Sequence, residues 1–152
     1  MIKVQADDFD IGFETDELIG DNTQIGAVVT FVGRVRDLHD DNSLSSMTLE
    51  HYPGMTEKML ADIEAEANNR WPLEASLIIH RYGPLEPGDN IVLVITASAH
   101  RQAAFEANQF LMDWLKTKAP FWKRESSEDG DTWVEAKTTD ETAAARWSTK
   151  DT

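Results

Sequence analysis

Basic side chains gather in one stretch, from Ser98 to Glu125, of a chain that is otherwise acidic. The stretch holds five of the fourteen Lys and Arg residues and only three acids, whereas the whole chain of 152 residues has a formal net charge of −14. Its basic residues are Arg101, Lys116, Lys118, Lys123 and Arg124. A local positive cluster in an acidic chain suits the binding of an anion. We therefore expect an anion-handling site here.

His100 and Arg101 fall in the first turn of a helix expected at about residues 100–118. Basic residues usually gather at the other end of a helix, because the macrodipole is already positive at the N-terminus. Free backbone N–H groups at a helix start bind phosphate, and Arg and His would add charge-assisted hydrogen bonds. This pattern predicts a phosphate or carboxylate clamp. The alternative is that both side chains point into solvent, or that Arg101 pairs with an acid elsewhere.

Lys116 and Lys118 fall in the last turn of the same helix, where lysine is expected without any further function. Lys116 directly follows two apolar residues, and partial shielding there would make its proton easier to lose. A tight turn at residues 119–120 would fold the next strand back and bring Lys123 within reach of Lys116. Two neighbouring lysines of this kind can polarise an oxyanion and shuttle protons.

The elements that must position these residues alternate irregularly. Strands are expected at residues 2–5, 27–35, 46–51, 75–82, 90–98, 121–126 and 131–136, and helices at about 16–19, 55–71, 100–118 and 141–147. Gly33, near the end of its strand, predicts a bulge or a close backbone approach. This order indicates an α+β fold with mainly antiparallel pairing. We expect one domain, 1–152, with an acidic N-terminal segment at about 7–21 and a tail at about 138–152.

Composition excludes several classes of function. The chain has no cysteine, so disulfides, thiolate metal sites and cysteine nucleophiles are excluded, and its four histidines lack metal-ligand spacing. A pI near 4.5 disfavours nucleic-acid binding. No apolar run is long enough to span a membrane, and no secretory pattern is present, so a cytoplasmic protein is expected. His51 and His80, near strand ends, are predicted to be structural.

Several segments together resemble a known family. They are VTFVGRVRD, LEHYPGMTEKML, HRYGPLEPGD, SAHRQAAFEANQFLMDWLKTKAPFWKRE and DGDTWVEA, in this order between about residues 26 and 147. The combination is similar to the large, catalytic subunit of molybdopterin synthase. The resemblance implies an α/β-hammerhead-like fold with an additional antiparallel β subdomain.

The resemblance also implies an activity. Members of this family convert cyclic pyranopterin monophosphate to molybdopterin, in molybdenum cofactor biosynthesis, without a cofactor or metal of their own. The sulfur arrives as the C-terminal thiocarboxylate of a small ubiquitin-like carrier subunit that ends in Gly-Gly. A homodimer with one carrier at each end gives a heterotetramer. A sulfur transferase without cysteine must obtain its sulfur from outside, and an organic phosphate substrate suits a basic pocket, so both sequence features agree with this implication.

The resemblance also implies roles for individual residues. Lys116 and Lys123 resemble the two catalytic lysines of the family, which also contact the substrate. His100 and Arg101 resemble the pair that binds the substrate's phosphate, contributed from the neighbouring subunit.

Two further segments resemble the lining of the same pocket. Arg36 resembles a pocket residue, with Arg34 and Val35 beside it, and Arg124 and Glu125 complete the pocket strand. Two other readings of the sequence stay open. One is a non-catalytic module that docks a ubiquitin-like tail or a pterin for another enzyme. The other is a generic phosphate-ester enzyme, which is disfavoured by the lack of a metal cluster or an obvious nucleophile.

Overall fold

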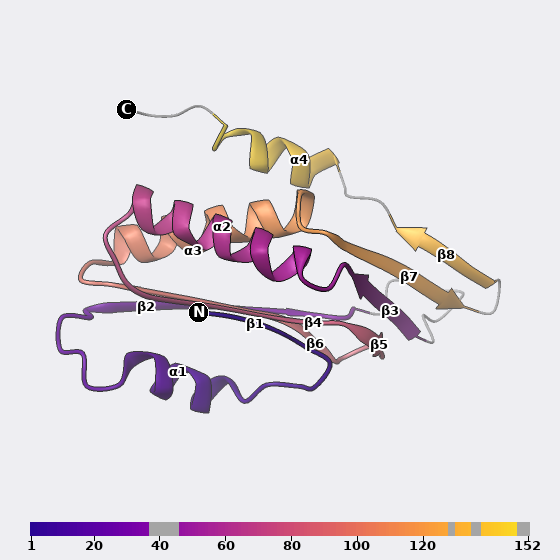
Figure 1. Ribbon diagram of the computed structural model, residues 1–152, viewed down its shortest axis with the longest axis horizontal. Coiled ribbons are helices and arrows are strands. Elements are labelled where there is room, and N and C mark those ends of the chain that lie inside the picture. The colour runs from indigo at the N-terminus through magenta and orange to yellow at the C-terminus, as the bar shows by residue number, and fades with distance from the viewer. Residues whose placement is uncertain (37–45, 128–129, 135–137, 149–152) are drawn as a thin grey trace.

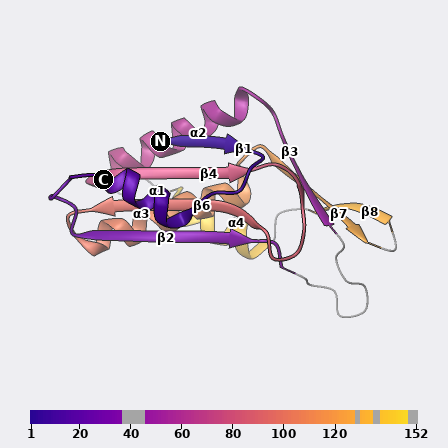
Figure 2. The ribbon, with the colours of Figure 1, turned by 90° about the horizontal axis from the view of Figure 1, so that it is seen from below.

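Two four-stranded sheets and four helices make up the structure, a computed structural model that describes residues 1–36, 46–127, 130–134 and 138–148. One sheet is covered by helices on both faces (Figure 1). The second sheet extends beyond one end of the first, as the view from below also shows (Figure 2). The α+β class and the mainly antiparallel pairing expected from the sequence are confirmed.

The first sheet has the strand order β1-β4-β6-β2. Its strands are β1 (Ile2–Gln5), β4 (Leu73–Arg81), β6 (Asn90–Ser98) and β2 (Ala27–Arg34). Only β1 and β4 pair in parallel, and the other two pairs are antiparallel. Because β2 ends the order, one of its edges has no strand beside it in the described structure.

The second sheet has the order β5-β3-β7-β8 and is antiparallel throughout. Its strands are β5 (Gly83–Leu85), β3 (Ser46–His51), β7 (Phe121–Ser127) and β8 (Gly130–Val134). The strands expected at residues 121–126 and 131–136 are present and pair with each other as β7 and β8, while residues 128–129 between them lie outside the described structure. β5 was not expected, because three residues, Gly-Pro-Leu, are too few to show a strand period.

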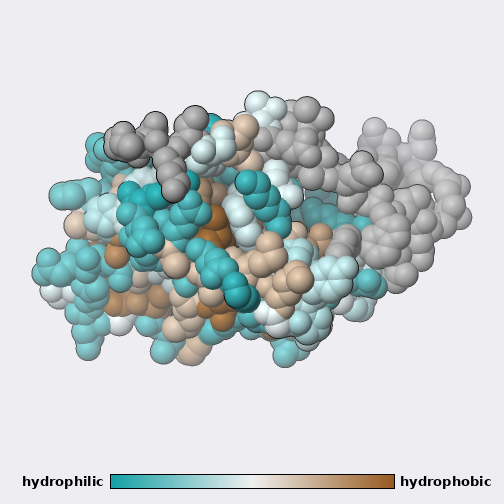
Figure 3. Space-filling view, turned by 45° about the horizontal axis from the view of Figure 1, so that its top comes forward, coloured by the Kyte–Doolittle hydropathy of each residue, from teal (hydrophilic) through white to brown (hydrophobic). Residues whose placement is uncertain are grey.

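Four helices accompany the sheets, and three of them cover the first one. They are α1 (Ile11–Ile19), α2 (Met55–Arg70), α3 (Arg101–Thr117) and α4 (Thr138–Ala145). α1 lies on one face of the sheet, α2 and α3 lie on the other, and α4 packs on α3 (Figure 1). Hydrophilic side chains cover much of the face that carries α2 and α3, and apolar atoms show between them (Figure 3).

Local signals explain the helix ends. The Asp10 carboxylate accepts a hydrogen bond from the Phe13 backbone N–H at 3.0 Å, so α1 begins at Ile11, five residues before the sequence suggested. Gly54, with a φ of 84°, precedes α2, and its N–H donates to the Glu57 carboxylate. α4 begins at Thr138 and ends at Ala145, before the expected bounds of 141 and 147, whereas α2 and α3 agree with the expected bounds to within one residue.

The core has two halves, one on each face of β4 and β6. Ile78 and Val94 face α2 and α3, where Phe110 and Leu111 join them, whereas Leu77 and Leu93 face α1. Successive residues of a strand point to opposite faces, so this division follows from period two. The same period places His80, two residues after Ile78, on the α2/α3 face of β4.

Candidate functional site

Lys116 and Lys123 approach one place from two different elements. Lys116 lies in the last turn of α3, which packs on the first sheet, and its side chain is exposed. Lys123 lies on β7 in the second sheet, opposite Leu49 of β3, and is half-buried. The shielding of Lys116 expected from its apolar neighbours is absent in the single chain, because Trp114 and Leu115 are themselves only partly buried.

His80 shows that the two lysines converge. Its side chain is only 7% exposed, and burial, with smaller contributions from the charges of Lys123, Lys116 and His51, lowers its pKa from 6.5 to about 4. Nδ1 lies 2.8 Å from the Arg81 carbonyl oxygen, which only accepts, so Nδ1 carries the proton and the bond favours the charged form. His80 is thus a neutral imidazole close to both lysine charges.

Aromatic rings surround His80 at the junction of the two sheets. The Phe121 ring is stacked on His80, with ring centroids 3.6 Å apart and an interplanar angle of 15°. His51 lies 4.5 Å from Tyr82 and 6.0 Å from Phe121, measured between ring centroids. The prediction that His80 and His51 are structural missed their position beside the lysines, because strand pairing and not sequence spacing brings them there.

The segment from Arg34 to Arg36 enters this region at the end of β2. The register shifts between Gly33 and Arg34, which confirms the bulge predicted at Gly33. A Cβ on Gly33 would lie 2.7 Å from Val92 Cγ1, so a larger residue would not fit without a shift. Because of the bulge, the faces of Arg34 and Arg36 cannot be assigned by simple alternation along β2.

The three residues of this segment have different environments. Arg34 donates from Nη2 to the Gly88 carbonyl oxygen at 2.6 Å. Val35 is buried in the core, and its backbone N–H and C=O are both bonded, to Asp89 and Gly88. Arg36 is exposed, and no described residue pairs with it. Val35 therefore supports the segment, and Arg36 is the member whose charge is available.

Arg124 and Glu125 follow Lys123 on β7. Their backbones pair with Thr48 and Met47 of β3, while their side chains lie outside the described part of the structure. Met47 packs in the same core cluster as Val35. This shared cluster brings the arginine segment and β7 to the same end of the molecule.

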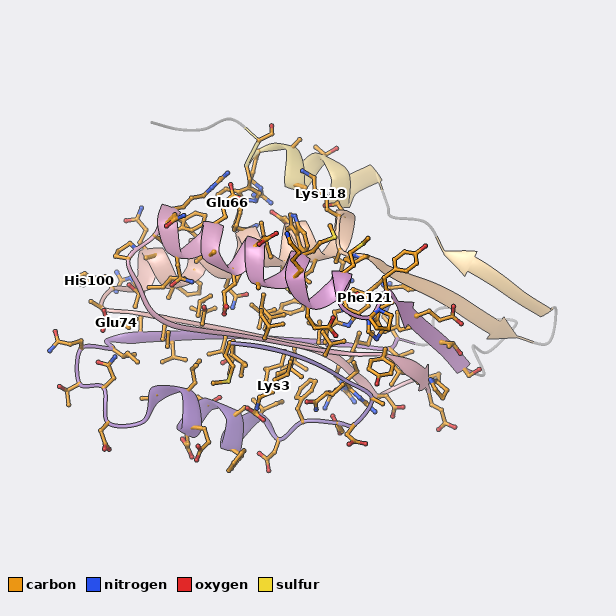
Figure 4. All side chains as sticks on the ribbon, in the orientation of Figure 1. Lys3, Glu66, Glu74, His100, Lys118 and Phe121 are labelled. Carbon is orange, nitrogen blue, oxygen red and sulfur yellow. The ribbon has the colours of Figure 1, made fainter. Side chains whose placement is uncertain are left out.

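His100 and Arg101 lie at the opposite end of α3, where Figure 4 labels His100 far from Phe121. The helix has 17 residues, which at about 1.5 Å per residue separates its ends by about 25 Å. In one chain, this pair therefore lies too far from Lys116 and Lys123 to share a small-molecule site with them.

The N-terminal end of α3 is open. A cavity of about 390 Å³ there is lined by Gly26, Ala27, Ala99, His100, Arg101 and Gln102. His100 and Arg101 are exposed, and in the described chain no carboxylate pairs with Arg101. A side chain at position 26 would collide with the Ala99 carbonyl oxygen, so this part of the cavity wall requires glycine. The predicted alternative in which Arg101 pairs with an acid elsewhere in the chain is therefore not found among the described residues.

Two findings concern other kinds of site. Among the side chains that the structure describes, no three of His, Asp or Glu come together as a metal site requires. No helix of residues 1–36, 46–127, 130–134 and 138–148 is long and apolar enough to cross a membrane.

Comparisons with known proteins agree with the geometry. A family model described as "MoaE protein" matches residues 4–118. A Pseudomonas aeruginosa protein named molybdopterin synthase catalytic subunit is 57% identical over 146 residues, covering 96% of this chain and 97% of its own. A solved structure from Burkholderia ambifaria, titled molybdopterin biosynthesis MoaE protein, has 51% identity and a TM-score of 0.84, and the match covers 99% of both chains.

A more distant structure shares the fold alone. It comes from Helicobacter pylori, is titled as a complex of subunits 1 and 2 of molybdopterin-converting factor, and has 20% identity, a TM-score of 0.71 and 90% coverage of each chain. The family-model match spans most of the chain, and the near-full-length identity to the Pseudomonas protein is well above what fold likeness alone gives. This chain therefore belongs to the MoaE protein family, the family of molybdopterin synthase catalytic subunits.

Proposed function

We propose that this chain is the catalytic subunit of a molybdopterin synthase, a sulfur transferase that converts cyclic pyranopterin monophosphate to molybdopterin. The observation that carries the proposal is the convergence of Lys116 and Lys123, from two elements, on one buried neutral imidazole. Membership of the MoaE family gives this pair its chemical context. The chain has no cysteine, so the sulfur must be supplied by a second molecule.

The supplier in this proposal is a small ubiquitin-like subunit that ends in a glycine thiocarboxylate. Its sulfur forms a C–S bond to the pterin side chain beside the lysines, and water then cleaves the acyl–sulfur bond, so that the carrier leaves with an ordinary C-terminal carboxylate. Lys116 stabilises the developing oxyanion or positions the terminal carbonyl of the carrier, and Lys123 moves protons or holds the cyclic phosphate as its ring opens. A second carrier delivers the second sulfur. Arg36, Arg34 and Val35, together with Arg124 and Glu125, line the pocket in this proposal.

His100 and Arg101 bind the substrate's phosphate from a second copy of the chain. The separation of about 25 Å along α3 supports this assignment over a role in their own chain's site. β2 is an edge strand in the described structure, and Val28 and Phe31 on it are each 37% accessible, so it offers a surface for that copy. Phe105 lies on α3, which packs against β2, and is 59% exposed. The proposed assembly is a homodimer with two carriers, a heterotetramer.

Reconstitution tests the proposal directly. Purified chain, thiocarboxylated carrier and cyclic pyranopterin monophosphate are mixed without other proteins, and molybdopterin is assayed. We expect product only when all three are present. If no product forms, a non-catalytic binding module is the better reading, and turnover without carrier would indicate a phosphate-ester enzyme.

We also propose that the reaction takes place in the cytoplasm. A net charge of −14 favours solubility, and cell fractionation tests the location.

A further inference from the structure

The His80–Phe121 stack is a direct contact between the two sheets. His80 belongs to β4 of the first sheet, and Phe121 is the first residue of β7 in the second. Their rings are nearly parallel, with centroids 3.6 Å apart. Lys123 follows Phe121 by two residues and therefore leaves the same face of β7. The ring that His80 supports thus belongs to the strand segment that aims Lys123.

The position of Lys116 is set by the first sheet, on the other side of the same junction. α3 packs on β6 and β2 of the first sheet, so Lys116 moves with that sheet. Lys123 moves with the second sheet through its pairing with β3. Any change in how the two sheets meet therefore changes the separation of the lysines, and the stacked rings lie where they meet.

The His80 ring is well suited to this support. Its Nδ1–H bond to the Arg81 carbonyl oxygen, at 2.8 Å, fixes the ring against its own strand. Three charged or titratable groups face it, Lys123 from β7, Lys116 from α3 and His51 from β3. Because the ring is neutral near pH 7, it adds no third positive charge beneath the two lysines.

His51 holds Phe121 from the second sheet. His51 is the cross-strand partner of Phe121 on β3. The Thr56 hydroxyl donates its only proton to the Tyr52 carbonyl oxygen at 2.7 Å, so it accepts from His51 Nδ1 at 3.1 Å. Both imidazoles are thus fixed by Nδ1–H donors, one on each side of the sheet junction.

We propose that His80 is a positioning residue for the lysine pair, which fixes Lys123 relative to Lys116 by stacking on Phe121 across the two sheets. The inference rests on the proposed function, because it needs Lys123 to take part in sulfur transfer. A displacement of about 1 Å at a reacting group costs on the order of 10²-fold in rate. Loss of the stack should therefore lower the transfer rate and leave carrier binding unchanged.

Substitutions at the stack separate support from general stability. In single-turnover sulfur transfer, corrected for folded protein, we expect His80→Ala to be slower by roughly 10- to 100-fold. His80→Phe keeps a ring and should stay within about 3-fold of the wild type. Phe121→Leu, which removes the other ring but keeps apolar volume, should match His80→Ala. Ile78→Ala is the control, since Ile78 is fully buried on the same face of the same strand.

Two results of this set would overturn the inference. One is an equal loss per folded molecule in Ile78→Ala and His80→Ala, which would make the effect one of stability alone. The other is a His80→Phe variant as slow as His80→Ala, which would assign the role to the imidazole nitrogens and not to the stack.

A double-mutant cycle shows whether His80 acts through Lys123. If it does, His80→Ala slows the wild type strongly but changes little in a Lys123→Ala background, or in Lys123→Arg if the alanine variant is too slow to measure. Additive losses would overturn the inference. Wild-type transfer by Lys123→Ala alone would instead contradict the proposed function, so the two failures are distinguishable.

Discussion

The two ends of α3 differ in how much of their surroundings one chain supplies. At the C-terminal end, Lys116 meets Lys123 of another sheet, and His80 and Phe121 support them from within. At the N-terminal end, His100 and Arg101 are exposed beside an open cavity of about 390 Å³. Figure 4 shows His100 near one end of the helix and Phe121 near the other. One end is formed within a single chain, whereas the other is open, and we propose that a second copy of the chain completes it.

The largest expected effect separates chemistry from binding at the two ends. Lys116→Ala and Lys123→Ala should each lower kcat by roughly 10²- to 10⁴-fold, because they remove an oxyanion stabiliser or a proton-transfer group. Arg101→Ala should mainly raise KM for the pterin substrate, by roughly 10-fold or more, because it removes a charge-assisted phosphate contact. Steady-state kinetics of the reconstituted enzyme measure both constants.

Lys118→Ala is the matched control for these variants. Lys118 is exposed two residues after Lys116, and its charge is not among those that act on His80. We expect both constants to stay within about 2-fold of the wild type. A loss equal to that of Lys116→Ala would mean that general positive charge, and not the placement beside His80, matters at this end.

The next effect concerns stability and belongs to the C-terminal end alone. The pKa of His80 is lowered from 6.5 to about 4, first by burial. Above pH 6.5 neither folded nor unfolded chain protonates this group, but below it the unfolded chain takes up a proton that the folded chain does not. The free energy of unfolding should therefore fall by about 1.4 kcal/mol per pH unit, or about 3 kcal/mol between pH 6.5 and 4.

His80→Phe isolates this contribution from that of the many carboxylates. Urea unfolding at several pH values should show the wild type losing about 3 kcal/mol more than His80→Phe between pH 6.5 and 4. Parallel pH dependence of the two proteins would mean that His80 is not held neutral in the folded state.

Mixing two impaired variants, assayed with the pterin substrate well below its KM, tests whether the ends meet across a dimer. His100→Ala/Arg101→Ala chains supply intact lysines, and Lys123→Ala chains supply the intact phosphate pair. After subunit exchange, about half of the dimers are mixed and each has one intact site, so activity should return to about a quarter of the wild type. Activity no higher than the average of the two parents would show that the ends do not share a site.

The sequence predicted most of this fold, but not the junction that organises the site. The strand at residues 2–5 and the bulge at Gly33 were readable because strand periodicity and glycine geometry are local signals. The approach of Lys123 to Lys116 could be predicted because a turn that contains proline links their two elements. His80 was not, because its contact with Phe121 joins strands that are 40 residues apart by their numbers and belong to different sheets.

Family resemblance and structure contribute differently to the N-terminal end. Charge alone left a clamp and solvent exposure open for Arg101, and a single chain still shows it exposed. The helix length then forces a choice, since a phosphate held there is about 25 Å from Lys116 of the same chain. The length of α3 and the exposure of Arg101 together therefore favour a site shared between two chains.

The smallest effect separates the ends by their response to salt. His100 and Arg101 are exposed, and the Debye length shrinks from about 14 Å at 0.05 M to about 4 Å at 0.5 M ionic strength. KM for the pterin phosphate should therefore rise by roughly 2- to 5-fold over this range, while kcat, set beside the buried His80, should change by less than about 2-fold. In Arg101→Ala the salt dependence of KM should become weaker. An unchanged salt dependence in this variant would indicate that the phosphate binds beside the lysines. The assignment of phosphate binding to one end of α3 and of chemistry to the other would then be wrong.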